Sequence, residues 1–251
     1  MPETPDSARH VRPFVHEGGR FRSLHFSIRE VQSRMSFDDP SALELEYSRT
    51  MMGFLLFKQE PKHIAMVGLG GGSLAKFCYR HLPAVRIEVV EINPHVLALR
   101  DEFQIPPDDE RLTVLLGDGA AFVREAGPGC DVLMVDGFDY DGQPSELSSQ
   151  AFYDDCADLL PAGGILVVNL FSRHAEYDLF VDRIRRSFAD EVLVVEGADL
   201  GNSIVLAFKD PKVPVKRMGA LRPPRHLDGA ASRQLAAGFA LTLTALKDAQ
   251  R

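Results

Sequence analysis

Short apolar segments alternate with segments of helical periodicity along the chain from Lys62 to about Asp210. This alternation is typical of consecutive β-α-β units, whose strands pair in a mostly parallel sheet with helices on both faces. Five apolar runs are predicted as buried strands, at residues 63–69, 86–92, 112–118, 130–138 and 164–171. The pattern therefore predicts an α/β fold around a doubly wound sheet.

Two further β-rich runs follow, at Glu191–Gly197 and Asn202–Asp210. The segment between them is too short for a crossover helix, so the two runs are expected to pair antiparallel as a hairpin. Together with the five preceding strands they predict a seven-stranded, mostly parallel Rossmann-like sheet of the methyltransferase type that ends in a C-terminal antiparallel hairpin.

Three regions are expected. Residues 1–58 form a small N-terminal region, with a β-hairpin over Arg22–Ser36 and a helix over Leu43–Phe57. Residues 59–210 form the nucleotide-binding catalytic domain. Residues 211–251 begin as an extended segment rich in proline and basic residues, and end in a helix that packs on the domain edge or on a partner subunit. We expect a homodimer.

Composition narrows the classes of partner. The 28 Lys and Arg residues against 36 Asp and Glu residues give a formal net charge of -8, which disfavours a nucleic-acid partner and favours a cationic substrate. Three widely spaced cysteines without a CxxC pair indicate neither a disulfide framework nor a zinc site. No run approaches the ~20 apolar residues needed to cross a bilayer, so we expect no membrane partner and a cytoplasmic protein. We also expect no metal.

The sequence VGLGGGS, at Val67–Ser73, lies between a predicted strand and a predicted helix. Glycines let the backbone pass close to a ligand and open the helix N-terminus, whose free N–H groups favour polar or anionic groups. Gly68, Gly70 and Gly72 fit the GxGxG pattern of methyltransferase-type folds, whereas a dinucleotide GxGxxG would need a glycine at Ser73. The alternative is a tight turn that binds no ligand.

Acidic residues follow the second and third predicted strands. Glu91 stands 23 residues after Gly68, near the ~20 expected for a carboxylate that binds ribose hydroxyls, although a solvated strand end is the alternative. Asp118 can accept a hydrogen bond from an adenine amino group, with Gly119 lining the base slot. An N-cap role is the alternative for Asp118, and it can fill both roles.

Three carboxylates follow the fourth predicted strand, in the sequence VDGFDYDGQP. Asp136, Asp139 and Asp141 repel one another, so a cationic sulfonium or amine between them best explains the cluster. Ligands of open α/β sheets bind at this carboxyl end of the strands. A turn built from Asp, Gly and Pro is the alternative, and it explains Asp141 better than Asp136.

From about Phe26 to Phe171 the sequence resembles the spermidine synthase family, the polyamine aminopropyltransferases. The resemblance rests on the glycine loop, VVEINPHVL, LLGDGAAFV and the long run from Asp136 through Phe152 and Tyr153 to Leu166. Gln32 also follows a hairpin strand much as in the N-terminal DGxxQ stretch of the family.

The resemblance implies a role for each matching residue. Gln32 and Glu91 hold the ribose and the methionine-derived portion of the donor, and Asp118 reads its adenine. Asp139 is the catalytic aspartate that accepts a proton from the attacking amine. We expect Asp136, at the active-site end of its strand, to be a second catalytic residue that also contacts the donor. Tyr47, which matches the tyrosine of a YHE stretch, and Tyr140 line the amine site. The implied donor is decarboxylated S-adenosylmethionine, and the implied acceptor is a small amine.

Several positions depart from the family pattern. Gly71 replaces the aspartate of the GGGDGG loop, which in the family helps to hold the donor ammonium. Ser48 and Arg49 replace the histidine and glutamate of YHE, and Tyr140 replaces a proline. The change at Gly71 is expected to make room for the carboxylate of intact S-adenosylmethionine.

Three functions therefore stay open at this point. The leading one is aminopropyl transfer from decarboxylated S-adenosylmethionine to a di- or polyamine. The second is methyl transfer from S-adenosylmethionine. The third is nucleotide binding by a relative that has lost catalysis.

Overall fold

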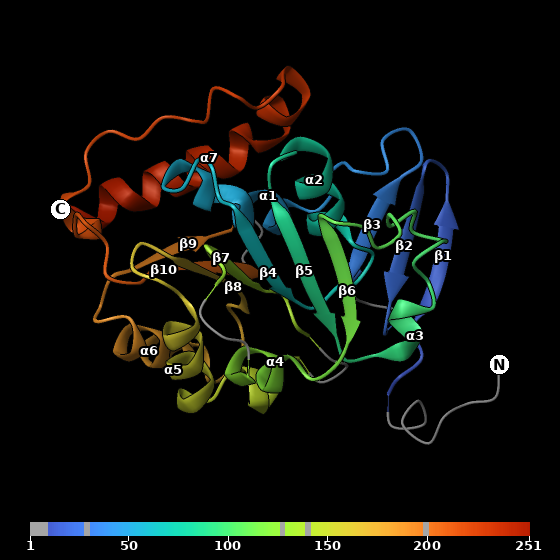
Figure 1. Ribbon diagram of the computed structural model, residues 1–251, viewed down its shortest axis with the longest axis horizontal. Coiled ribbons are helices and arrows are strands. Elements are labelled where there is room, and N and C mark those ends of the chain that lie inside the picture. Colours follow the sequence, from blue (N-terminus) through green and yellow to red (C-terminus); the bar gives the residue numbers. More distant parts are fainter. Residues whose placement is uncertain (1–9, 28–30, 126–128, 139–141, 198–200) are drawn as a thin grey trace.

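The chain folds around two β-sheets that lie side by side, a large central one and a small N-terminal one (Figure 1). The structure is a computed structural model that describes residues 10–27, 31–125, 129–138, 142–197 and 201–251.

The central sheet has seven strands in the order β6-β5-β4-β7-β8-β10-β9. Strands β4 to β8 pair parallel, and β10 pairs antiparallel with both β8 and β9. The predicted methyltransferase-type sheet with its C-terminal hairpin is confirmed. The strand bounds are His63–Val67 (β4), Arg86–Glu91 (β5), Leu112–Leu116 (β6), Val132–Val135 (β7), Ile165–Phe171 (β8), Val192–Glu196 (β9) and Asn202–Phe208 (β10).

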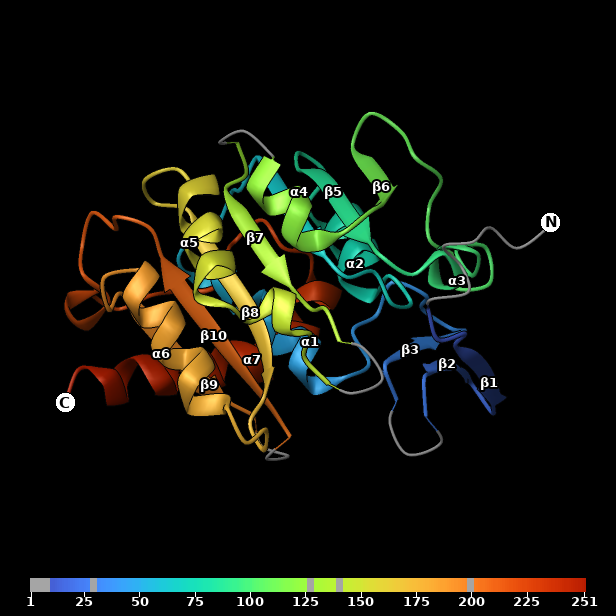
Figure 2. The ribbon, with the colours of Figure 1, turned by 90° about the horizontal axis from the view of Figure 1, so that it is seen from below.

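Helices cover both faces of this sheet. On one face lie α1 (Glu46–Met51), the 3-10 turn η2 (Met52–Leu56), α2 (Ser73–His81) and α7 (Gly229–Ala249). On the other face lie α4 (Gly119–Glu125), α5 (Gln150–Leu159) and α6 (Tyr177–Ser187), which Figure 2 shows in the foreground. Short helical turns are α3 (Pro94–Leu97), η3 (Ser145–Leu147) and η4 (Val215–Arg217).

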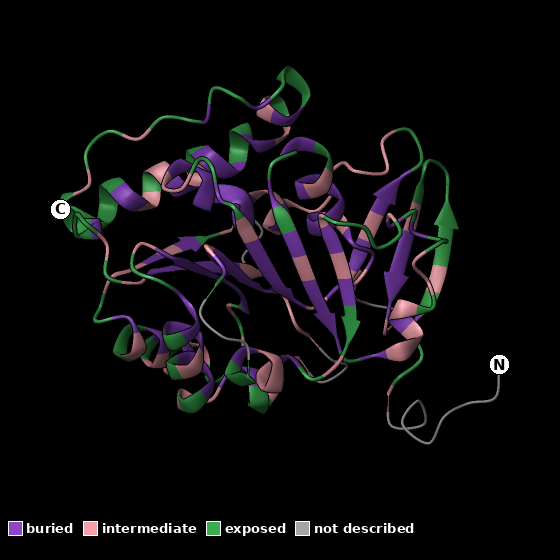
Figure 3. Cartoon of the chain, viewed as in Figure 1, coloured by how far each residue is buried: buried purple, intermediate pink, exposed green. Residues whose placement is uncertain are grey.

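Alternate residues of each strand feed two separate hydrophobic clusters. Ile64 and Met66 of β4 belong to the cluster under α1, α2 and α7, whereas Ala65 and Val67 belong to the cluster under α4, α5 and α6. Because successive strand side chains point to opposite faces, a continuous apolar run is what a strand covered on both faces needs. Figure 3 shows the resulting buried strands between helices whose outer sides are exposed.

The N-terminal sheet has three antiparallel strands, β1 (Phe14–Gly18), β2 (Phe21–His25) and β3 (Ser33–Ser36). The predicted hairpin over residues 22–36 corresponds to β2 and β3, and β1 adds a strand that was not predicted from the sequence. The helix predicted over Leu43–Phe57 is shorter than expected, because only Glu46–Met51 is α-helical before the chain tightens into η2.

The C-terminal helix α7 packs on its own domain, against α1, η2 and β9. Leu235 and Phe239 of this helix are buried in the larger hydrophobic cluster. Asp228 caps the helix by accepting hydrogen bonds from the N–H groups of Ala230 and Ala231, and its other oxygen lies 2.8 Å from His81 Nδ1 on α2. The basic segment before the helix is mostly without regular structure.

The order of the strands fixes where a ligand can bind. In the central sheet, β4 comes first in the sequence, β5 and β6 follow on one side of it, and β7 and β8 follow on the other side. The loops that leave β4 and β7 therefore diverge at the carboxyl edge of the sheet and open a crevice between them. In the described part of the chain no helix is both long and apolar enough to cross a membrane.

We predict that Lys76 gives the free energy of unfolding a distinct pH dependence. Lys76 lies on α2, is 2 % exposed, and donates a hydrogen bond to the carbonyl of Phe103 at 2.7 Å. Burial lowers the pKa of its ammonium to about 8. Between pH 8 and about 10.4, the ordinary lysine value, the unfolded chain keeps a proton that the folded chain has lost, so stability from this group rises with pH by up to about 3 kcal/mol.

Urea denaturation at pH 7.5 and pH 10 measures this effect as a difference between variants. The rise should be smaller in Lys76→Met than in the parent protein and unchanged in Lys247→Met, whose side chain is exposed. Equal pH dependence in all three proteins would contradict the prediction. Because the chain has no tryptophan, circular dichroism follows the transition.

Candidate functional site

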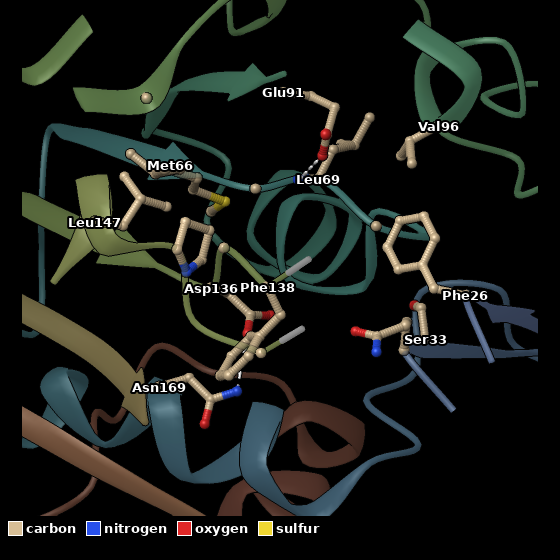
Figure 4. Close-up of a pocket in the computed structure, with 18 of the residues that line it drawn as sticks. Phe26, Ser33, Met66, Leu69, Glu91, Val96, Asp136, Phe138, Leu147 and Asn169 are labelled. Atoms are coloured by element: carbon tan, nitrogen blue, oxygen red, sulfur yellow. Dashed lines mark hydrogen bonds between the residues drawn. The ribbon is translucent and has the colours of Figure 1, made fainter. Parts of the chain in front are cut away.

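A cavity of about 980 Å³ opens at the carboxyl edge of the central sheet. Its walls come from the loops that follow β4, β5, β6, β7 and β8, from α1, and from the end of the N-terminal sheet. Figure 4 shows side chains from both sheets around it, with Phe26 and Ser33 on the N-terminal side and Asp136 and Asn169 on the opposite side. This volume is at the upper end of the range for small-molecule sites, ~300–1,000 Å³.

Gly68, the first residue after β4, packs against the backbone of Asp136, the first residue after β7. Its φ angle is +95°, and a Cβ atom there would lie 2.3 Å from the carbonyl oxygen of Asp136. The end of β4 and the end of β7 therefore touch through backbone alone. Any other residue at position 68 would push Asp136 away or strain the loop.

The glycine loop meets the sequence prediction in part. Gly68 and Gly70 line the cavity, whereas Gly72 does not. A Cβ atom at Gly72 would meet the side chain of Ile105 at 2.6 Å. A side chain at position 72 would thus point toward Ile105 and away from the cavity, and contact between Gly72 and a ligand stays a prediction.

Glu91 closes β5 and lies on the cavity wall, where it is 8 % exposed. Its two carboxylate oxygens accept hydrogen bonds from the backbone N–H groups of Leu69 and Asn93, both at 2.8 Å. Burial raises the pKa of this carboxyl, and the backbone hydrogen bonds oppose the rise. Because each carboxylate oxygen has two lone pairs, Glu91 can brace the glycine loop and still accept a ligand hydroxyl.

Asp118 and Gly119 also line the cavity, at the start of α4. One oxygen of Asp118 accepts a hydrogen bond from the N–H of Ala121 at 2.9 Å. The N-cap role that the sequence left open is thus present, and the position on the cavity wall keeps the second carboxylate oxygen available to a ligand.

Asp136, directly after β7, is held from two sides. The hydroxyl of Tyr47 on α1 donates to its Oδ2 at 3.2 Å, and the side-chain amide of Asn169 on β8 donates to its Oδ1 at 2.9 Å. Burial raises the pKa of the Asp136 carboxyl, whereas these two hydrogen bonds lower it. Burial, and then the charge of Asp136, raise the pKa of Tyr47 well above its ordinary value, so Tyr47 stays a hydrogen-bond donor.

Gln32 and Tyr47 join the N-terminal region to this wall. Both line the cavity, and the Tyr47 hydroxyl also lies 3.4 Å from the backbone oxygen of Gln32. The structure therefore places Gln32, Tyr47, Glu91, Asp118 and Asp136 around one space. Their contacts with a ligand remain predictions, and Asp139, Tyr140 and Asp141 lie outside the described residues.

The space beside Gly71 is filled. A Cβ atom there would lie 2.6 Å from the hydroxyl of Ser33 and 2.7 Å from the ring of the buried Phe103. Ser33 in turn lies 3.2 Å, hydroxyl to hydroxyl, from Ser73. Ser33 and Phe103 therefore occupy the direction of the missing side chain, and room for a larger ligand group beside Gly71 stays a prediction.

Several polar residues of the cavity wall were not predicted from the sequence, and three of them lie in strands. Ser33 lies in β3, Asn169 in β8, and Asn202 at the start of β10. Asn169 carried a signal, since it is the one polar residue within the apolar strand ILVVNLF. Ser33 and Asn202 carried none, because only the packing of the N-terminal sheet and the hairpin brings them here.

A methyltransferase-type sheet with acidic residues after β5, β6 and β7 defines the class of Rossmann-like, nucleoside-binding folds. Comparison with known proteins narrows this class. Residues 44–187 match the spermine/spermidine synthase domain. A polyamine aminopropyltransferase of Chromobacterium violaceum is 39 % identical over 210 residues, covering 80 % of each chain.

Solved structures agree on the fold. A probable spermidine synthase from Corynebacterium glutamicum superposes with a TM-score of 0.72 at 20 % identity, covering 94 % of this chain and 90 % of that chain. Human methyltransferase-like protein 13, solved in complex with SAH, superposes with a TM-score of 0.59 at 22 % identity, covering 80 % of this chain and 93 % of that chain. The chain belongs to the spermine/spermidine synthase family.

We predict that Gly68→Ala destabilises the protein by about 3 kcal/mol or more, because it combines a strained backbone angle with a backbone clash. Gly163→Ala is the matched control, since Gly163 has a φ of +77° and an added Cβ atom would meet nothing within 4 Å. The control should cost only about 1 kcal/mol. Urea denaturation of the three proteins gives both values, and equal losses would show that the contact with Asp136 is unimportant.

Proposed function

We propose that the protein transfers an aminopropyl group from decarboxylated S-adenosylmethionine to a di- or polyamine. One observation carries this proposal. The cavity holds a hydrogen-bonded carboxylate, Asp136, across from a second carboxylate, Glu91, that braces the glycine loop. The first suits a cationic group, and the second suits the hydroxyls of a nucleoside. Family membership supports the same reaction.

The nucleoside half of the donor lies along the ends of β5 and β6. Glu91 accepts hydrogen bonds from the ribose hydroxyls, and Asp118 accepts one from the adenine amino group. Gly119 and Gly70 line the space beside them without side chains that would fill it. Gln32, from the N-terminal region, covers the methionine-derived portion.

The reacting half lies beside Asp136. The acceptor amine arrives as an ammonium and gives a proton to Asp139, as the family resemblance implies. The free amine nitrogen then attacks the carbon next to the sulfonium sulfur. A carbon–nitrogen bond forms, the carbon–sulfur bond breaks with its electron pair going to sulfur, and methylthioadenosine leaves. Tyr47 and Tyr140 line the amine, and Asp136 holds positive charge close to the sulfur.

Methyl transfer from intact S-adenosylmethionine is the second candidate. Gly71 favours it, because no acidic side chain stands at this point of the glycine loop. The filled space beside Gly71 weighs against it, since Ser33 and Phe103 occupy the direction of the missing side chain. We therefore rank it below aminopropyl transfer.

The proposal extends to the setting of the enzyme. We infer a cytoplasmic homodimer that acts on a small amine, without a nucleic-acid partner and without a metal. The three cysteines are free and buried, which fits a reducing compartment. The excess of acidic residues fits a cationic substrate better than a polyanion.

Replacement of Asp139 tests the function. In Asp139→Asn the side chain keeps its shape but loses its charge and basicity, so turnover should fall by about 10²–10⁴-fold while donor affinity stays nearly constant. Asp141→Asn is the matched control, because it removes a neighbouring carboxylate that the turn alone explains. With a diamine acceptor, the assay measures methylthioadenosine released from decarboxylated S-adenosylmethionine, and S-adenosylhomocysteine together with methylated amine formed from intact S-adenosylmethionine.

Other results would contradict specific parts of the proposal. Methylated product from intact S-adenosylmethionine would establish the second candidate. No transfer from either donor, with tight nucleoside binding, would identify a protein that binds without catalysis. Equal turnover in the parent protein and Asp139→Asn would remove Asp139 from the chemistry and leave Asp136 as the residue to test.

A further inference from the structure

Two asparagines form a ladder of hydrogen bonds that ends on Asp136. The side-chain N–H of Asn202 donates to the side-chain oxygen of Asn169 at 2.9 Å, and the N–H of Asn169 donates to Asp136 Oδ1 at 2.9 Å. Figure 4 shows the second of these bonds, with Asn169 reaching from β8 toward Asp136. Asn202 is the first residue of β10, so the C-terminal antiparallel hairpin also contributes to the site.

The ladder has two directions with opposite consequences. An asparagine side chain presents N–H donors on one side and an oxygen acceptor on the other. When Asn202 donates, the Asn169 oxygen faces Asn202 and its N–H faces the carboxylate. If Asn169 turned over, its oxygen would face Asp136, and only a protonated Asp136 could make that hydrogen bond.

Because the site is buried, the orientation of the Asn169 amide affects the charge state of Asp136. Asn169 is 2 % exposed, so water cannot easily replace a missing partner. Burial also disfavours the charge on Asp136. Within the described ranges, the N–H of Asn169 and the hydroxyl of Tyr47 are the donors that oppose this effect. Tyr47 faces Oδ2, which leaves Asn169 as the donor at Oδ1.

We propose that Asn202 is a positioning residue that keeps the amide of Asn169 turned toward Asp136, and so keeps that carboxylate ionised and aimed for a cationic substrate. The nature of the substrate rests on the proposed function, whereas the ladder itself does not. Asn202 does not contact Asp136 directly and acts through Asn169. The hairpin is thereby coupled to the charge state of Asp136.

Other titratable groups line the same cavity and are common to every variant compared below. They are Glu46 of α1, Glu91 after β5, Asp118 after β6, Glu146 of η3, and Arg173 and His174 after β8, with His10 from the N-terminal segment. Because these groups are unchanged, a difference between variants reports the ladder rather than their charges.

Carbon-13 NMR of protein labelled at the aspartate carboxyl groups tests the proposal without substrate. Asp136→Asn identifies the Asp136 signal by its loss. In Asn202→Ala the titration midpoint of Asp136 should rise by about 0.5–1 pH unit, because Asn169 no longer has a donor that fixes its direction. Asn169→Leu, which removes the N–H itself, should raise the midpoint at least as far.

Ser203→Ala is the matched control. Ser203 is the next residue of β10, is fully buried, and has its hydroxyl 2.7 Å from that of Tyr177 rather than in the ladder. This variant should leave the Asp136 midpoint at the parent value. A midpoint that moves equally in Asn202→Ala and Ser203→Ala would contradict the proposal, since loosening of the hairpin would then explain both.

An unchanged Asp136 titration midpoint in Asn202→Ala, together with a raised midpoint in Asn169→Leu, would also overturn the proposal, because Asn169 would then keep its direction without Asn202.

The same variants can be assayed for transfer to 1,4-diaminobutane. If the proposed function holds, the acid limb of kcat/KM should move to higher pH in Asn202→Ala by the same amount as the midpoint. A shifted midpoint without any transfer activity would uphold the ladder and reject the proposed function.

Discussion

The contact between Gly68 and the backbone of Asp136 is the constraint on which the site depends. It joins the end of β4 to the end of β7, the two strands at which the sheet order reverses. The glycine loop leaves on one side of this contact, toward Glu91, and the carboxylate of Asp136 lies on the other side, toward Tyr47 and Asn169. The proposed nucleoside and cation subsites therefore lie on opposite sides of this close packing between β4 and β7.

The N-terminal sheet contributes part of the cavity wall and packs against the glycine loop. Ser33 packs against Gly71 and contacts Ser73 at the start of α2, and the ring of Phe103 also packs against Gly71. Lys76 fastens the segment that carries Phe103. Ser33 and Phe103, which carry no charge, thus occupy the space that the aspartate side chain of the family loop would take. Among the described residues, Asp136 is then the main carboxylate near the proposed reacting atoms.

The fold could be predicted from the sequence because each buried strand is a continuous apolar run with a turn signal after it. The strand β1 was missed because its sequence, FVHEG, is mostly exposed and has no apolar face to signal it. Glu91, Asp118 and Asp136 could be predicted because each lies at or just beyond the carboxyl end of a strand. Asn202 could not, because its role depends on the register of the hairpin against β8. The position of Gly72 beside Ile105 could not either, because spacing does not tell which side of a loop faces a cavity.

Calorimetric titration with methylthioadenosine and with decarboxylated S-adenosylmethionine tests most directly whether Asp136 holds the positive charge of the donor. The two ligands share the nucleoside but differ in the sulfonium and ammonium charges. The parent protein should bind the charged ligand about 10–100-fold more tightly, the range for a hydrogen-bonded charge. Asp136→Asn should lose most of that preference and keep its affinity for methylthioadenosine. A preference of equal size in both proteins would contradict the account.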